Sequence, residues 1–516
     1  MEEYYIFKLL AISSALLLLY PLITVVHAIW WRPKRIEKQL RQQGIRGTSY
    51  KLFHGDIREI KKCTGEAWSK PMTLDHRISP RALPFFHEML QKYGKLSVFW
   101  NGTRPRLMVG DPELMRLILA DKNGHLVKMP LNPLTSMLQL GLSILEGEPW
   151  AKHRKLITPA FHLEKLKRMV PAFETSCFGL IDRWKKLISP QGSSEIDVAP
   201  ELQNLASDVI ARTAFGSSFE EGKMIFELLK ELTKLVHESF QKIYIPGFRF
   251  IPTNKNKRRY NIVKEINAIL RDMIRKKEEA MRINGDSGND DLLGLLLQCK
   301  EESDTDNNNG LTIEDVIEEC KFFYFAGQET TATLLTWTLI VLSMHPDWQQ
   351  KARDEVLHIC AKRTPDFEAI NQFKIVPTIL YEVLRLYPPL TSLYGHTHQK
   401  TNIGGLSIPA GVDLALPMLL LHNDPNYWGE DVEKFNPERF SKGISKATKD
   451  QIAFYPFGWG PRICIGQNFA MVEAKMALTM ILQHFSFQLS PSYAHAPCTI
   501  ITLKPQYGAP IILHRI

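Results

Sequence analysis

The sequence predicts a mainly α-helical fold with small β-sheets, an α+β protein, preceded by one N-terminal transmembrane helix. Helical spacing of apolar residues runs through most of the 516 residues. The β-like runs are short, as at residues 96–100, 107–109 and 509–513. The chain also opens on a long apolar run. Because 44% of the side chains are hydrophobic and only 23% are charged, the remainder can bury a large core.

The opening run predicts the transmembrane helix. From Leu9 to Trp31, 23 residues contain no Asp, Glu, Lys or Arg. At ~1.5 Å per residue a helix of this length covers about 34 Å, enough for a hydrocarbon core of about 30 Å. A cleaved signal peptide is the alternative, but its apolar region is shorter, and here two tryptophans and a basic cluster follow. We therefore expect a membrane anchor over residues 1–31 and a cytosolic domain over residues 32–516.

The net charge and the cysteine pattern exclude several functional classes of protein. The net charge of +9 suggests an acidic partner or an anionic membrane surface, and no nucleic-acid-binding module is recognisable. Seven scattered cysteines with no C-x-x-C spacing argue against a disulfide framework, a zinc ribbon and covalent haem attachment. A reducing compartment suits this pattern, with one cysteine left for chemistry of its own.

A long helix is predicted after two polar segments, Asn284 to Asp291 and Glu301 to Gly310, which are expected to be loops. Thr312 is a suitable N-cap with Asp315 three residues later, and Pro346 marks the end, which gives about 32 residues. The uncharged part of this helix is too short for a second membrane span. We expect a buried core helix.

The most specific signal is a loop around Cys464, directly before a helix expected from about Gln467 to Phe485. A cysteine at a helix N-terminus has a stabilised thiolate that can ligate iron. Gly460 permits a tight backbone, and Gly466 leaves room for a flat macrocycle. Arg462 would supply a cation where the propionate of such a macrocycle would lie, and Phe457 would shield the thiolate from water. A small buried cysteine in a turn is the alternative, but five fixed positions in ten residues argue against it: FGWGPRICIG.

With this loop the chain resembles the cytochrome P-450 family of haem-thiolate monooxygenases. Four stretches resemble the plant branch that includes secologanin synthase and triterpenoid oxidases: residues 32–47, 146–173, 323–338 and 458–478. The resemblance implies a single haem-domain prism, haem b (iron protoporphyrin IX) on Cys464, and dioxygen as oxidant. The expected reaction is hydroxylation or further oxidation of a hydrophobic metabolite of terpenoid type.

The resemblance also implies a setting for the enzyme. It would be a single-pass protein of the endoplasmic reticulum membrane with its catalytic domain in the cytosol. Electrons would come from an NADPH-dependent cytochrome P-450 reductase, whose acidic face would dock on the basic surface made by Lys152, Arg154, Lys155 and Lys165. The substrate pocket is expected to be apolar, with lining from residues 137–144, 322–330, 389–394 and 498–503.

Further motifs match family roles. Glu329 and Thr330, in the Ala326–Thr331 segment of the long helix, resemble the acid and alcohol that serve oxygen binding and proton delivery; a kinked helix with solvent-facing polar residues is the alternative. Trp150 and Arg154 match the W-x-x-x-R pattern that donates to the haem propionates. All four are candidate site residues.

Three charged residues match a structural motif of the family, and one position differs from the family pattern. Glu382 and Arg385 share one helix face, and with Arg439 they match the set that fixes the cysteine side of the fold. After Pro388-Pro389 the family often has an arginine that points to a propionate, but this chain has Gly395-His396 there. Either His396 substitutes for that arginine, or the contact is absent.

Two other functions remain open from the sequence. One is a haem-thiolate isomerase or dehydratase that needs no reductase, against which the Glu329-Thr330 pair argues. The other is a non-catalytic haem-binding protein. The substrate, the oxidised carbon, the number of oxidation steps, the pathway and the oligomeric state do not follow from the sequence.

Overall fold

The computed structural model describes residues 2–122, 124–138, 141–189, 192–216, 219–240, 244–284, 291–305, 310–448 and 453–516. The α-helices are α1 Glu2–Val26, α2 Arg32–Gln42, α3 Ile57–Trp68, α4 Ser79–Ala82, α5 Pro84–Tyr93, α6 Pro112–Leu119, α7 Gly147–Ile157, α8 Leu163–Leu187, α9 Val198–Phe215, α10 Phe219–Phe240, α11 Asn254–Asn284, α12 Leu292–Thr305, α13 Ile313–Met344, α14 Pro346–Cys360, α15 Phe367–Gln372, α16 Ile375–Leu386, α17 Met418–His422, α18 Pro425–Trp428 and α19 Gln467–His484.

The strands are short, as expected, and the mainly helical α+β class is confirmed. They are β1 Arg46–Gly47, β2 Leu96–Asn101, β3 Arg104–Val109, β4 Leu126–Val127, β5 Ser193–Asp197, β6 Leu393–Thr397, β7 Thr401–Ile403, β8 Leu406–Ile408, β9 Asp413–Leu416, β10 Phe485–Leu489, β11 Pro497–Ile500, β12 Thr502–Pro505 and β13 Pro510–Arg515. The three predicted runs correspond to β2, β3 and β13. The largest sheet has the order β1-β2-β3-β9-β6-β4, and a second sheet has the order β10-β13-β5.

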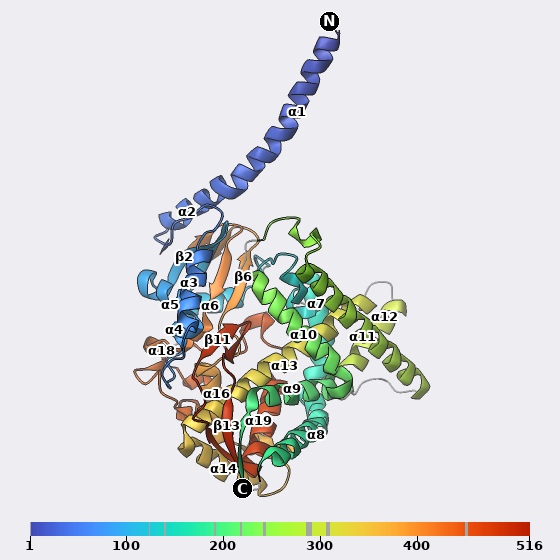
Figure 1. Ribbon diagram of the computed structural model, residues 1–516, viewed down its shortest axis with the longest axis vertical. Helices are drawn as coiled ribbons and strands as arrows, with labels where there is room; N and C mark the ends of the chain where they lie inside the picture. Colours follow the sequence, from blue (N-terminus) through green and yellow to red (C-terminus); the bar gives the residue numbers. More distant parts are fainter. Residues whose placement is uncertain are drawn as a thin grey trace.

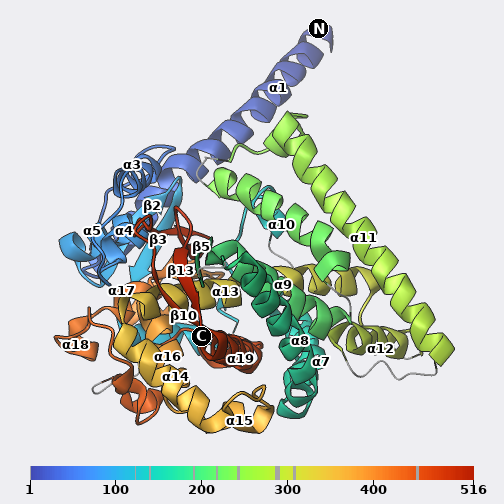
Figure 2. The same ribbon diagram turned by 60° about the horizontal axis from the view of Figure 1, so that its bottom comes forward.

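Helix α13 crosses the centre of the body, where it packs against α9, α16 and α19 (Figures 1 and 2). Its first turn carries the predicted cap: the Asp315 amide donates to the Thr312 hydroxyl at 3.1 Å, and the Thr312 amide donates to the Asp315 carboxylate at 2.9 Å. Every side chain from Thr331 to Leu342 is buried. The prediction of a 32-residue core helix is confirmed.

Helix α1 extends away from the body, and a π-helical turn over His27–Trp31 joins it to α2 (Figure 1). Large apolar side chains such as Phe7, Leu17 and Trp31 are exposed along it. Among the residues that the structure describes, no helix has both the length and the apolar character that a membrane span requires. The transmembrane helix therefore stays a prediction from the sequence.

The predictions of loops at residues 284–291 and 301–310, before α13, compare differently with the structure. Residues 285–290 and 306–309 lie outside the described residues, so most of the first predicted loop and part of the second are not tested. Residues 301–305 are helical and form the end of α12, so the prediction of a loop beginning at Glu301 was wrong. The polar residues Glu301, Glu302 and Ser303 continue the helix begun by the apolar Leu292–Leu297 run. Polarity alone does not end a helix.

Candidate active site

The loop before α19 holds Cys464 at the start of that helix. The Cys464 amide donates to the Phe457 carbonyl at 2.9 Å, which closes the loop on itself. Gly460 has a φ of +72°, and a Cβ there would lie 2.3 Å from the carbonyl oxygen of Leu119 in α6. Position 460 therefore excludes a side chain for two independent reasons. The tight backbone predicted at Gly460 is confirmed.

The Cys464 side chain lies deep in the protein and is still accessible. Of the seven cysteines, all of which the structure describes, only Cys464 is exposed; Cys63 is half-buried and the other five are buried. Burial nevertheless raises the pKa of the Cys464 thiol, against the opposing effects of the Gly466 backbone amide and the Arg154 charge. Protein therefore surrounds the thiol, which still remains open to a bound group.

Basic side chains from two elements lie beside Cys464. Arg154, in α7, donates through Nη1 to the Ile463 carbonyl at 2.9 Å. Arg462 donates through Nη2 to the Leu145 carbonyl at 3.0 Å, forms an ion pair with Glu146, and places its guanidinium 4.6 Å from the Trp150 ring centroid. Burial lowers the pKa of both arginines. The structure therefore brings Trp150, Arg154, Arg462 and Cys464 into one region, as the sequence motifs predicted.

The middle of α13 is partly accessible, although this helix crosses the centre of the body (Figure 1). Phe325, Ala326, Gly327 and Thr330 are half-buried, whereas the turns that follow are fully buried. Ala326 and Thr330 share one helix face, and the Thr330 hydroxyl donates to the Ala326 carbonyl at 2.8 Å. A Cβ at Gly327 would lie 2.8 Å from Ile210 Cδ1 in α9. Gly327 therefore serves close helix packing, and α13 continues through it without a break.

Glu329 faces a different set of partners from Thr330. Its Oε1 accepts hydrogen bonds from Thr502 Oγ1 at 2.6 Å and from Lys504 Nζ at 2.5 Å, both in β12. Its Oε2 accepts from Gln203 Nε2 in α9 at 3.4 Å. Glu329 is buried while the Lys504 side chain is 37% exposed, so the ion pair connects a buried carboxylate to the surface. The alternative of a solvent-facing polar turn on α13 is wrong.

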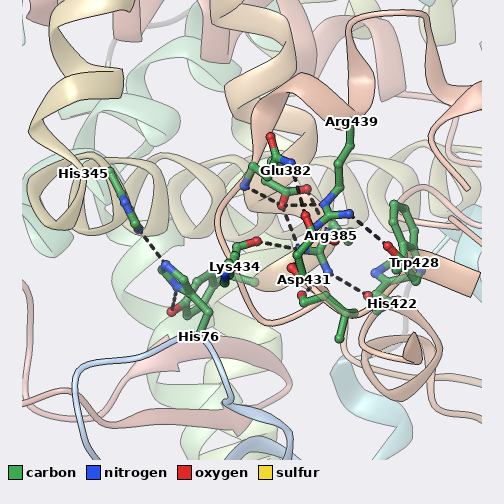
Figure 3. Close-up of polar contacts among 12 residues, drawn as sticks. His76, His345, Glu382, Arg385, His422, Trp428, Asp431, Lys434 and Arg439 are labelled. Carbon is green, nitrogen blue, oxygen red and sulfur yellow. Dashed lines mark hydrogen bonds and ion pairs between the residues drawn. The ribbon is translucent and has the colours of Figure 1, made fainter. Parts of the chain in front are cut away.

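A buried ionic cluster ties the end of α16 to the segment that precedes the cysteine loop (Figure 3). Arg385 donates through Nε and Nη2 to the Glu382 carboxylate at 2.8 and 2.7 Å, and neither side chain is exposed. Arg439 lies 3.5 Å from the same carboxylate and pairs with Asp431 at 2.6 Å. Arg385 also donates to the carbonyls of His422, Val432 and Lys434. The predicted meeting of Glu382, Arg385 and Arg439 is confirmed.

Sequence comparison agrees with this arrangement. A sequence model described as cytochrome P-450 matches residues 77–507. The chain belongs to the cytochrome P-450 family. It is 53% identical over 492 residues to cytochrome P-450 CYP72A616 of Paris polyphylla, with 95% of each chain covered. It is 47% identical to 7-deoxyloganic acid hydroxylase of Catharanthus roseus, with 97% of each chain covered, and 47% identical to secologanin synthase 1 of the same plant, with 94% of each chain covered.

Members of the cytochrome P-450 family are monooxygenases that bind haem b through a cysteine thiolate. The residues present here fit that group. The thiol is accessible, and beside it lie two partly buried arginines. Partly buried cations of this kind suit the two carboxylates of a haem. A Cβ at Gly466 would come no closer than 3.9 Å to Phe161, so the room predicted there for a macrocycle stays a prediction.

Several residues of this cytochrome P-450 site carried no motif in the sequence. Thr502 and Lys504 bind Glu329 from β12, far along the chain. Glu319 in α13 is fully buried; it lies 2.7 Å from His153 Nδ1 in α7 and accepts the Leu142 amide at 3.0 Å. This contact holds residues 141–142 of the expected pocket wall against α13. Glu319 lies among the other charged residues of residues 313–321, so no local pattern distinguishes it.

Proposed function

We propose that this cytochrome P-450 is a membrane-anchored monooxygenase that hydroxylates or further oxidises a hydrophobic plant metabolite of terpenoid type. The observation that carries the proposal is the accessible Cys464 thiol at the start of α19, flanked by Arg154, which donates to the neighbouring Ile463 carbonyl. Two similar proteins support the substrate class, because the names 7-deoxyloganic acid hydroxylase and secologanin synthase refer to terpenoid-related compounds.

The protein's residues divide the work of holding the cofactor. Cys464 would bind the iron, with Phe457, Gly460 and Gly466 shaping the loop around it. Trp150, Arg154 and Arg462 would bind the carboxylates. Bound there, haem b supplies the dioxygen activation that no side chain can provide. Burial opposes thiolate formation at Cys464, and the Gly466 amide and Arg154 favour it, so these two groups stabilise the form that ligates metal.

Proton supply is the task assigned to Glu329 and Thr330. Glu329 Oε1 receives hydrogen bonds from the partly exposed Lys504 ammonium and from the Thr502 hydroxyl, so protons can reach it from the surface. The Thr330 hydroxyl donates its own proton to Ala326 O, which leaves its oxygen as an acceptor toward the interior. Thr330 thus orients a proton donor, and Glu329 restores the proton that is used.

The substrate pocket is proposed to lie along the half-buried face of α13. The other expected lining comes from residues 137–138 and 141–144, from residues 389–394 and from the β11–β12 hairpin; residues 139 and 140 lie outside the described residues. The Leu503 amide donates to the Pro389 carbonyl at 2.9 Å, which joins two of these segments directly. Their Leu, Met, Phe and Ile side chains suit a rigid hydrocarbon skeleton.

Attachment to the endoplasmic reticulum membrane through residues 1–31, with residues 32–516 in the cytosol, is proposed from the uncharged run Leu9–Trp31 and the basic flank after it. The large apolar side chains of α1 that the structure describes support this, because they are exposed. An NADPH-dependent cytochrome P-450 reductase is the proposed electron donor. Its docking surface would comprise Lys152, Lys155 and Lys165, whereas Arg154 is turned inward toward Ile463.

The deciding experiment is turnover with purified protein, cytochrome P-450 reductase and NADPH on a panel of terpenoid acids, alcohols and hydrocarbons. We expect products that gain one oxygen atom, with ¹⁸O incorporated from labelled dioxygen, and NADPH consumption that depends on substrate. Product formation without NADPH would indicate an isomerase or dehydratase. Haem binding with no product from any compound would indicate a non-catalytic haem protein.

A further inference from the structure

Strand β6 lacks the arginine that the family pattern led us to expect, and Lys128 lies directly across from the gap. Strands β4 and β6 are antiparallel, with Leu126 opposite Thr397 and Val127 opposite His396. Continuing this register by one residue places Lys128 opposite Gly395. Side chains that face each other across an antiparallel pair project from the same face of the sheet and lie about 5 Å apart at Cβ. The Lys128 side chain can therefore reach the region in which a side chain at position 395 would lie.

His396 does not meet this requirement. Neighbouring residues in a strand point to opposite faces, so His396 projects away from the face shared by positions 128 and 395. Its Nδ1 lies 2.8 Å from Asp413 Oδ1, and Asp413 also pairs with Arg106 at 3.4 Å. His396 thus belongs to a separate polar cluster. Of the two alternatives left open by the sequence, substitution by His396 is disfavoured.

The charge on Lys128 has no counter-charge of its own. The Lys128 backbone amide donates to Glu146 Oε1 at 2.5 Å, while the other oxygen of this carboxylate binds Arg462. The ammonium group itself makes no hydrogen bond or ion pair with any residue that the structure describes. Burial lowers the pKa of Lys128, the nearby Arg462 charge lowers it further, and Glu146 only partly opposes them. Two partly buried cations therefore lie beside one carboxylate, and a bound anion would offset the repulsion between them.

We infer that the Lys128 ammonium, together with Arg462, binds one carboxylate of the haem and replaces the arginine that is absent at position 395. The inference rests on the proposed haem site around Cys464. The positive charge that the family pattern places in β6 is thus supplied here by the residue that follows β4, the neighbouring strand. Lys128 is thus a cofactor-binding residue whose role depends on Gly395.

The first test compares the rate of haem loss from the holoprotein to an excess of apo-globin acceptor. A charge-assisted hydrogen bond contributes about 1.5–3 kcal/mol, so Lys128→Met should lose haem about 10- to 150-fold faster than the wild type. Lys128→Arg should stay within about threefold, because the guanidinium preserves the charge. The control is Lys122→Met, an exposed lysine in the same segment, for which no change is expected.

The second test is a rescue across the strands. Gly395 has no positive φ, and a Cβ there would meet its nearest atoms, Val127 O and Leu414 Cβ, at 3.7 and 3.9 Å, so the backbone and its neighbours admit a side chain at this position. In the Lys128→Met background, Gly395→Arg should restore haem retention to within about threefold of the wild type, since it returns the missing charge.

The results of the two tests distinguish a failure of the Lys128 assignment from a failure of the proposed function. Equal haem loss from Lys128→Met and the wild type would overturn the inference. So would a defect that Lys128→Arg shares equally, or one that Gly395→Arg fails to correct, because both would indicate a general structural effect. If the wild-type protein takes up no thiolate-ligated haem, judged by its reduced carbon monoxide spectrum, the proposed function fails instead.

Discussion

Thr330 and Glu329 are consecutive residues whose polar atoms serve different surroundings. The Thr330 hydroxyl is bonded within α13 and borders the interior, whereas the Glu329 carboxylate is held by β12. This separation suits a relay in which one group orients a proton and the other replaces it. Helix packing alone would not require Lys504 to pair with Glu329.

Thr330→Ala should therefore uncouple the reaction. Substrate binding and haem content should remain, while the rate of product formation falls about 10- to 1,000-fold and much of the NADPH consumed yields peroxide. Product, peroxide and NADPH should be measured in the same sample. An unchanged ratio of product to NADPH would mean that Thr330 only packs and that protons arrive elsewhere.

Cys464→Ser should abolish thiolate ligation. A serine hydroxyl is far less acidic than a thiol, so it would not provide the anionic ligand that the Gly466 amide and Arg154 favour. The reduced carbon monoxide spectrum of the variant should lack the thiolate band. Cys63→Ser, at a half-buried cysteine outside the site, is the matched control and should keep it. Persistence of the band in Cys464→Ser would exclude this assignment.

At the scale of elements, the Glu382 cluster sets how α16 meets the segment before the cysteine loop. Glu382→Gln keeps the shape but leaves the fully buried Arg385 without its carboxylate, which should cost about 3–5 kcal/mol of folding free energy. Glu113→Gln removes an exposed carboxylate from the Arg116 pair in α6 and should leave the folding free energy nearly unchanged, because solvent screens this pair. Thermal midpoints and the yield of haem-bearing protein should separate the two. Similar losses in both variants would contradict the structural role of the cluster.

Helix α1 is expected to be dispensable for folding. The large apolar side chains described along it are exposed, and it extends from the body (Figure 1). Removal of residues 1–31 should release protein from membranes while haem binding is retained, as judged by flotation and the carbon monoxide spectrum. Loss of haem binding in every detergent-free preparation would show that α1 is part of the fold.

The sequence predicted elements with strong local signals and missed contacts between distant ones. The Thr312 cap, the length of α13 and the Gly460 turn follow from residues within a few positions of each other, and all three are present. Lys504 is 175 positions from Glu329, and Lys128 is opposite Gly395 only through strand register, so neither relation has a local pattern. The end of α12 was missed because its polar residues continue the helix begun by the apolar Leu292–Leu297 run, and polarity alone does not end a helix.

At the scale of the whole molecule, buried neutral histidines link stability to pH. Burial lowers the pKa of His76 and His422 to about 3 and that of His495 to about 4. His76 lies 2.8 Å from both the Tyr387 hydroxyl and His345 Nε2 (Figure 3). In the unfolded chain a histidine titrates near 6.5, so below that pH the unfolded state binds protons that the folded state excludes.

The stabilising effect of these histidines is complete above pH 6.5 and is lost as the pH falls toward 4. Guanidinium midpoints should therefore be nearly level from pH 8 to 7 and should decline steadily between about pH 6.5 and 4. His76→Gln should make that decline shallower, even if it lowers the midpoint at neutral pH. A midpoint that is the same at pH 7 and pH 5 would contradict the burial of these rings in neutral form.

The ion pair between Glu329 and Lys504 has a consequence for chimeric enzymes. The β11–β12 hairpin contributes both to the expected pocket wall and, through Thr502 and Lys504, to the surroundings of the α13 carboxylate. Exchanging this hairpin between relatives to alter product profiles would also alter the charge beside Glu329. A chimeric enzyme that accepts a new substrate would then consume NADPH without forming product unless the exchanged hairpin retains a lysine at position 504. Crossover points chosen between α19 and the C-terminus should accordingly be judged by electron economy as well as by regioselectivity.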